Sequence, residues 1–111
     1  MKLINLPETP GEYKLSQLLI HEQPTTIFGA TNEFHQEHIR EALKQQNITY
    51  PYLLPTYQGE NYQILGGGKI YLNPPNKELS KPYSHMIGYN RQPHEQLTNQ
   101  LLKTLNWKLT T

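Results

Sequence analysis

Two stretches of the chain place apolar and polar residues with the spacing of an amphipathic helix. The first begins near residues 31–33, where Thr31 or Asn32 can serve as the N-cap, and it ends at Asn47, a residue type that tolerates the left-handed conformation after a helix. The second covers residues 94–105. The apolar positions of the two stretches are Phe34, Ile39, Ala42, Leu43, Leu97, Leu101, Leu102 and Leu105. We therefore expect two helices, each with one face against a core.

Shorter apolar runs, rich in β-branched and aromatic residues, predict strands around these helices. The predicted strands cover residues 25–28, 52–54, 62–65, 68–72, 84–89 and 107–109, of which the second and third would form a hairpin. Residues 13–20 fit either a helix or a buried strand. Residues 1–12 and 73–82 are expected to be irregular, because prolines or glycines punctuate them. This order of elements predicts an α/β fold of the α+β type, with a single mixed sheet flanked by two helices.

Three consecutive glycines, Gly66 to Gly68, interrupt the predicted strands and are followed directly by Lys69. A glycine weakens a strand, because it costs backbone entropy and leaves no side chain to pack. Three in a row indicate a β-bulge, a tight bend, or a place where another group approaches the backbone closely. With a cation next to it, the run also suggests an anion site, and the sequence leaves these alternatives open.

Composition narrows the class of protein. The chain of 111 residues suits one domain, 1–111, and its formal net charge of +1 lacks the basic excess of a protein that binds a nucleic-acid backbone. The sequence has no cysteine, which excludes disulfides and thiolate chemistry and fits a reducing compartment. The first residues turn polar too soon for a signal peptide, and no apolar stretch approaches the ~20 residues of a membrane span. We expect a soluble, cytoplasmic protein.

Histidines are the side chains most able to carry chemistry here. The sequence contains His21, His35, His38, His85 and His94. His35 lies in the first turns of the predicted helix, where unpaired amides favour anions, and an imidazole can act as a base or a nucleophile near neutral pH. The plain alternative is a histidine on a solvated helix face. His35 and His38 lie three apart, but no H-E-x-x-H pattern or third ligand accompanies them, so no metal is expected.

Four short blocks, in order along the chain, follow one family's pattern. Residues 65–70 are similar to an L-G-G-G-R-I block, with Lys69 in place of arginine. Residues 32–35 are similar to an A-E-Y-H segment, and residues 11–14 to a G-V-F-K segment. Residues 88–90, with a histidine opening a helix after them, are similar to a G-Y-S stretch. Together the blocks resemble the phosphohistidine phosphatase family, also called the Janus/Ocnus family.

The resemblance implies a mixed sheet with two flanking helices, and a phosphatase that hydrolyses a phosphorus–nitrogen bond such as that of protein phosphohistidine. His35 would be the catalytic residue, as general base or as nucleophile, with no metal and no cofactor. The residues expected to bind the phosphoryl group are Lys14, Gln36, Lys69, Asn90 and Gln92. The two lysines would neutralise the phosphoryl oxygens, while the Asn90 side chain and the backbone amides of the two glutamines would donate hydrogen bonds to them.

Departures from the family pattern put the choice of substrate in question. Asn90 stands where the family has a phosphate-binding serine, and the stretches 47–65 and 72–83 are longer than expected. The expected partner is a phosphorylated protein or a small phosphorylated substrate, with no nucleic acid and no membrane, and a monomeric state fits these features. A second hypothesis is a non-catalytic module that binds a phosphorylated ligand or a partner protein, with tyrosines of the first long stretch as its aromatic surface.

Overall fold

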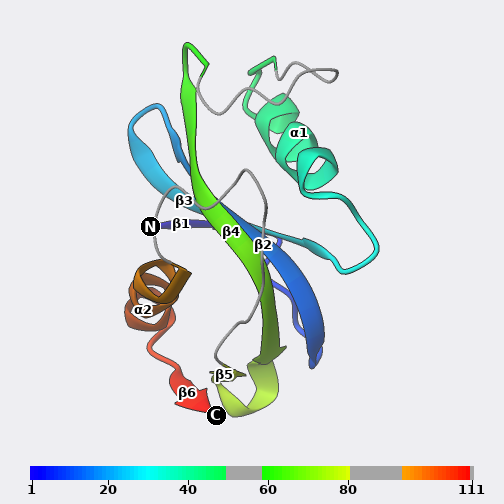
Figure 1. Ribbon diagram of the computed structural model, residues 1–111, viewed down its shortest axis with the longest axis vertical. Helices are drawn as coiled ribbons and strands as arrows, with labels where there is room; N and C mark the ends of the chain where they lie inside the picture. Colours follow the sequence, from blue (N-terminus) through cyan, green and yellow to red (C-terminus); the bar gives the residue numbers. More distant parts are fainter. Residues whose placement is uncertain (50–58, 81–93, 111) are drawn as a thin grey trace.

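A computed structural model describes residues 1–49, 59–80 and 94–110, and for residues 94–97 it describes the backbone alone. Figure 1 shows the arrangement of the elements. In chain order they are β1 (Lys2–Ile4), β2 (Gly11–Ile20), β3 (Gln23–Ala30), α1 (His35–Gln45), β4 (Tyr62–Asn73), the 3-10 helix η1 (Pro74–Asn76), β5 (Glu78–Ser80), α2 (His94–Leu105) and β6 (Lys108–Thr110). None of these helices is long and apolar enough to cross a membrane.

The strands of the described ranges form one six-stranded sheet in the order β1-β3-β2-β4-β5-β6. The pairs β1–β3 and β5–β6 are parallel, and the three other pairs are antiparallel. The expected fold, a mixed sheet with two helices, is therefore confirmed. The second predicted helix has the observed bounds, and the last strand lies one residue later than predicted.

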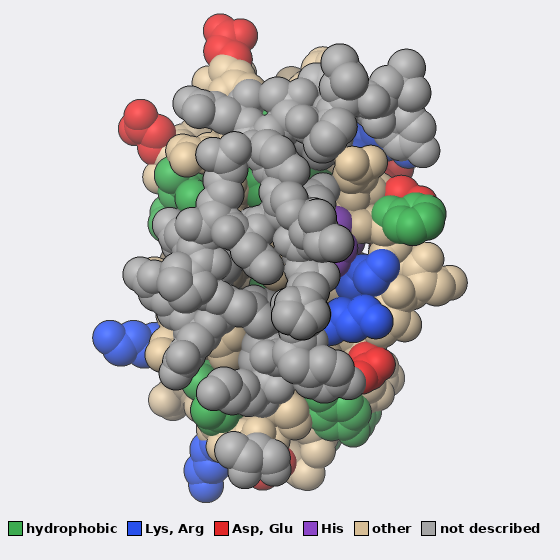
Figure 2. Space-filling model, viewed as in Figure 1, with side chains coloured by type: hydrophobic (Ala, Val, Ile, Leu, Met, Phe, Trp, Pro, Cys, Tyr) green, Lys and Arg blue, Asp and Glu red, His purple; other side chains and the backbone are tan. Residues whose placement is uncertain are grey.

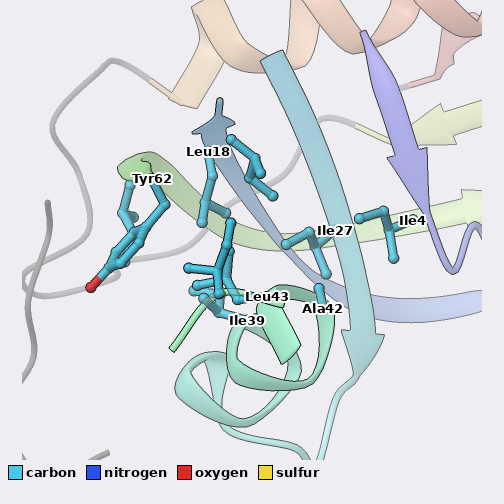
Figure 3. Close-up of a cluster of buried hydrophobic side chains, with 10 residues drawn as sticks. Ile4, Leu18, Ile27, Ile39, Ala42, Leu43 and Tyr62 are labelled. Atoms are coloured by element: carbon cyan, nitrogen blue, oxygen red, sulfur yellow. The ribbon is translucent and has the colours of Figure 1, made fainter. Parts of the chain in front are cut away.

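The two helices cover opposite faces of the sheet. Ile27 and Phe28 are successive residues of β3, so their side chains point to opposite faces. Ile27 packs in a cluster with Ile39 of α1, whereas Phe28 packs in a second cluster with Leu101 of α2. Figure 3 shows the first cluster, in which α1 contributes its buried stripe to the side chains of β2, β3 and β4. Each core thus joins one helix to one sheet face.

Helix α1 begins later than the sequence suggests. Its N-cap is Phe34, which makes no side-chain capping hydrogen bond, so the prediction of Thr31 or Asn32 as N-cap is wrong. The backbone N–H of Glu33 instead donates to the carbonyl of Ala30 at 3.0 Å, which closes a turn between β3 and the helix. This turn makes His35 the first residue of the helix. The predicted left-handed residue Asn47 is confirmed, with φ of 60°.

Strand β2 resolves the ambiguity of residues 13–20, because it pairs along its whole length with β3 and β4 and buries both faces. Residues 1–12 and 73–82 were expected to be irregular, which is wrong in part. They contain β1, the start of β2, η1 and β5. The short strands β1 and β5 pair with distant segments, and such pairing leaves no local periodicity to read.

The glycine run does not interrupt a strand. Strand β4 continues from Tyr62 through the three buried glycines to Asn73, so the prediction of two separate strands is wrong. Gln17 pairs with Gly66 and Leu18 with Ile64, which leaves Leu65 as the extra residue of a β-bulge. The bulge that the glycines suggested is present immediately before them. The strands predicted at residues 52–54 and 84–89 lie outside the described residues.

Candidate functional site

Two lysines lie side by side on the sheet. Lys14 of β2 pairs directly with Lys69 of β4 in the antiparallel ladder, so both side chains point to the same face. That face is the one covered by α1, because Lys14 lies an even number of positions from Leu18, which packs against the helix. Like charges directly opposite each other destabilise a sheet. A sheet that keeps this pair creates a local positive potential suited to an anion.

Lys14 is held against the turn that leads into α1. Its Nζ donates a hydrogen bond to the carbonyl oxygen of Glu33 at 2.7 Å and lies 5.7 Å from the ring centroid of Phe34. Phe34 is 69% exposed, so its ring stands at the surface beside the lysine. Figure 2 shows basic side chains in blue next to a histidine in purple on the face viewed. The cations of this region are therefore adjacent to imidazole.

His35 stands over the same sheet face. The hydroxyl Oγ of Ser16, two residues after Lys14 on β2, lies 3.0 Å from His35 Nδ1. Two residues along a strand return to the same face, so Ser16 and Lys14 are neighbours beneath the start of the helix. The structure thus brings His35 and both lysines to one place, as the resemblance implies, although they come from three separate elements.

His38 completes the cluster from beneath the helix. Its Nε2 lies 2.8 Å from the same Ser16 oxygen, and its ring centroid lies 5.2 Å from that of His35 in an edge-on arrangement. His38 is 3% exposed. A side-chain carbon on Gly29 of β3 would collide with the His38 ring, so only glycine leaves room for it. Within the described residues, Nδ1 of His38 has no hydrogen-bond partner.

Both imidazoles are neutral at physiological pH. Burial, followed by the neighbouring His38 and the charges of Lys14 and Lys69, lowers the pKa of His35 to about 3. Burial and the charge of Lys14 lower the pKa of His38 to about 4. These causes disfavour the charged form of each ring. A neutral imidazole keeps one nitrogen lone pair, which nucleophilic or general-base chemistry requires.

The position of His35 at the N-terminus of α1 adds amide donors to the cluster. Gln36 is the second residue of the helix and lies in its first turn. The backbone N–H groups of a first turn have no hydrogen-bond acceptor within the helix. Such amides and the helix dipole favour an anion. The half-buried Gln36 therefore lies where its backbone can contribute to a site formed by the lysines and His35.

Four of the six predicted site residues, namely His35, Lys14, Gln36 and Lys69, come from this one region. Asn90 and Gln92 lie outside the described residues. Sequence reasoning missed Ser16 and His38 as partners of His35. A serine within the apolar run of β2, spaced two residues from a lysine, was the available signal for the first.

The described part of the chain has no group of three or more His, Cys, Asp or Glu side chains that could hold a metal ion. The sequence matches no protein-family model, and no curated protein matches it either. We therefore infer a function from the geometry of the cluster and from the four-block resemblance.

Proposed function

We propose that this protein is a phosphatase that hydrolyses a phosphorus–nitrogen bond, such as that of protein phosphohistidine. One observation carries the proposal: Lys14, Lys69 and a neutral His35 converge on one face of the sheet at a helix N-terminus. The four-block resemblance points to the same chemistry. The cysteine-free sequence suits the reducing cytoplasm, which we propose as its compartment.

The two lysines and the backbone amides supply positive charge and hydrogen-bond donors for a phosphoryl group. The transition state is loose and spreads its charge over the phosphoryl oxygens, so catalysis depends on positioning and electrostatic stabilisation. Lys69 is exposed and Lys14 is fixed by Glu33, so the pair combines an accessible cation with an oriented one. The first-turn amides of α1 would donate to the remaining oxygens.

His35 would react through Nε2, since Nδ1 is in contact with Ser16. As a general base it takes a proton from water while the water oxygen bonds to phosphorus and the P–N bond breaks. As a nucleophile it bonds to phosphorus itself, and water then releases phosphate from the phosphorylated ring. In both routes the leaving nitrogen keeps the P–N electron pair and gains a proton. Both routes need the lone pair on Nε2.

A hollow lies at the end of β3, next to the turn that leads into α1. It has a volume of about 410 Å³, and Gly29, Ala30 and Glu33 are among the residues that line it. The carbonyl of Glu33 also accepts the hydrogen bond from Lys14.

Phosphate release from phosphohistidine and phospholysine tests the proposal. We expect the wild type to hydrolyse at least one of them, and His35→Ala to lower the rate on the order of 10²- to 10⁴-fold, because the reacting group is removed. His21→Asn is the matched control, since it removes an exposed imidazole from the β2–β3 turn and should keep the wild-type rate.

Equal rates in wild type and His35→Ala would remove His35 from the mechanism. Binding of the phosphorylated ligands without turnover by the wild type would instead favour a non-catalytic phosphate-binding module.

A further inference from the structure

The hydroxyl of Ser16 bridges two imidazoles, and this arrangement restricts their protons. Its oxygen lies 3.0 Å from His35 Nδ1 and 2.8 Å from His38 Nε2. Ser16 is fully buried, and the structure gives its hydroxyl no other hydrogen-bond partner among the described residues. A hydroxyl has one proton and two lone pairs, so it can donate to one ring and accept from the other, or accept from both. Accepting from both would leave the buried Ser16 proton without an acceptor among the described residues, which is costly.

Two arrangements satisfy both contacts and also give the Ser16 proton an acceptor when the rings are neutral. In the first, His38 donates from Nε2 to Ser16, and Ser16 donates to Nδ1 of His35, so each ring carries its proton on Nε2. In the second, His35 donates from Nδ1 to Ser16, and Ser16 donates to Nε2 of His38, so each ring carries its proton on Nδ1. The two histidines therefore share one tautomer.

The surroundings of His38 choose between the two arrangements. Its Nδ1 is buried, has no hydrogen-bond partner in the described part of the chain, and packs against Gly29. In the second arrangement that nitrogen carries a proton, so a buried N–H would lack an acceptor. In the first it carries only a lone pair, which can face the Cα–H of Gly29. A buried N–H without an acceptor costs more free energy than a buried lone pair without a donor. The population of the first arrangement should therefore exceed that of the second on the order of tenfold or more.

We propose that Ser16 locks His35 and His38 into the same tautomer with the proton on Nε2 of each ring, so that the ligand-free site presents an N–H donor at His35. Ser16 and His38 are then positioning residues. This inference deepens the proposed function, and it rests on that function only where it concerns the reaction at Nε2 of His35. Turnover through Nε2 requires the second arrangement. To reach it, His35 gives its Nε2 proton to water, Ser16 passes its proton to His35 Nδ1 and takes the Nε2 proton of His38, and His38 gains a proton from water on Nδ1. The bridge therefore regulates how often the reactive form occurs.

Long-range ¹H–¹⁵N correlation spectra of the full chain with labelled histidine rings test this at pH 7.5. We expect both His35 and His38 to show the Nε2–H pattern in the wild type. In Ser16→Ala we expect His35 to move toward a mixture of tautomers, because its Nδ1 loses the donor. The ring of the exposed His21 should not change, and it serves as the internal control. A structural role of Ser16 alone would not alter one ring's tautomer selectively.

An Nδ1–H pattern for either ring, or different patterns for the two rings, would overturn the proposal. The wild-type spectrum decides this even if Ser16→Ala does not fold. Titration with inorganic phosphate separates the inference from the proposed function. Shifts at His35 Nε2–H without a tautomer change support the donor role, and conversion to the Nδ1–H pattern contradicts it. With the Nε2–H pattern present, a lack of response at His35 supports the tautomer assignment and contradicts the phosphate site.

Discussion

The absence of a side chain at Gly29 determines how the His38 ring is placed. Gly29 lies beneath the His38 ring, and a methyl group there would approach His38 Cγ to 2.8 Å, closer than real side-chain carbons come. Because the ring is held between the helix and the sheet, it cannot move away without shifting α1 or losing its contact with Ser16. The positions of His38 and Ser16 in turn orient His35. The geometry of the candidate site therefore depends on the absence of a side chain at Gly29.

Gly29→Ala tests this dependence. We expect a loss of about 1–3 kcal/mol in the free energy of unfolding, because the added methyl overpacks a filled core. Urea denaturation measures it. Gly11→Ala is the matched control at the start of β2, since its nearest neighbour would lie at 3.6 Å, an ordinary contact distance. Equal losses in the two variants would show that the His38 contact does not matter.

The lysine pair makes a separate prediction at the residue scale. Lys69→Met should lower kcat/KM for phosphohistidine by about tenfold or more, because a cation next to the phosphoryl oxygens is lost. Lys108→Met removes an exposed lysine from β6 and should leave kcat/KM at the wild-type value. If both variants behave alike, Lys69 does not contact the phosphoryl group.

The hairpin between β2 and β3 carries strain at its tip. His21 and Glu22 have φ of 49° and 65°, the left-handed values that a two-residue hairpin turn requires. Asn-Gly is the favoured pair there, because most other side chains clash with their own backbone in this conformation. The chain tolerates an unfavourable pair at the tip of the β2–β3 hairpin.

Replacing both residues, as His21→Asn with Glu22→Gly, should therefore stabilise the protein by about 1 kcal/mol or more. The midpoint of urea denaturation should rise, while the rate of phosphate release stays unchanged, because the turn lies at the other end of β2 from Lys14. An unchanged or lower midpoint would mean that the turn is not strained.

The helices could be predicted from the sequence, because the spacing of apolar residues and left-handed residues such as Asn47 are local signals. The pairing of Lys14 with Lys69 could not, since it depends on a register set by contacts between distant strands and by the bulge at Leu65. Only the family resemblance placed these residues in one site. The Ser16 bridge could not be predicted for the same reason, because a serine in a strand does not indicate which helix packs against that strand.

For the whole molecule, the half-buried imidazole of His35 and the buried imidazole of His38 link stability to pH. The pKa values of His35 and His38 are lowered to about 3 and about 4, whereas an unfolded chain holds histidine near 6.5. The unfolded state therefore binds more protons below pH 6.5, and stability rises with pH in that range. The contribution is complete above pH 6.5 and is lost as the pH falls toward the folded-state values.

Urea denaturation between pH 7 and pH 5 should show this loss, at about 1 kcal/mol per pH unit below pH 6.5 from the buried His38. His38→Gln should have a smaller pH dependence, because one titrating ring is removed. A wild-type stability that stays constant over this range would contradict the assignment of neutral, desolvated imidazoles.

The proposed function requires His35 and the two lysines to act together on a phosphorus–nitrogen bond. The most direct measurement is a ³¹P NMR time course of a phosphohistidine peptide mixed with a phosphoserine peptide, with wild type and with His35→Ala. We expect the wild type to remove the phosphohistidine signal faster than its spontaneous decay and to leave phosphoserine intact. With His35→Ala, we expect the phosphohistidine signal to decay at the spontaneous rate. Spontaneous decay with both proteins, or equal acceleration by both, would contradict it.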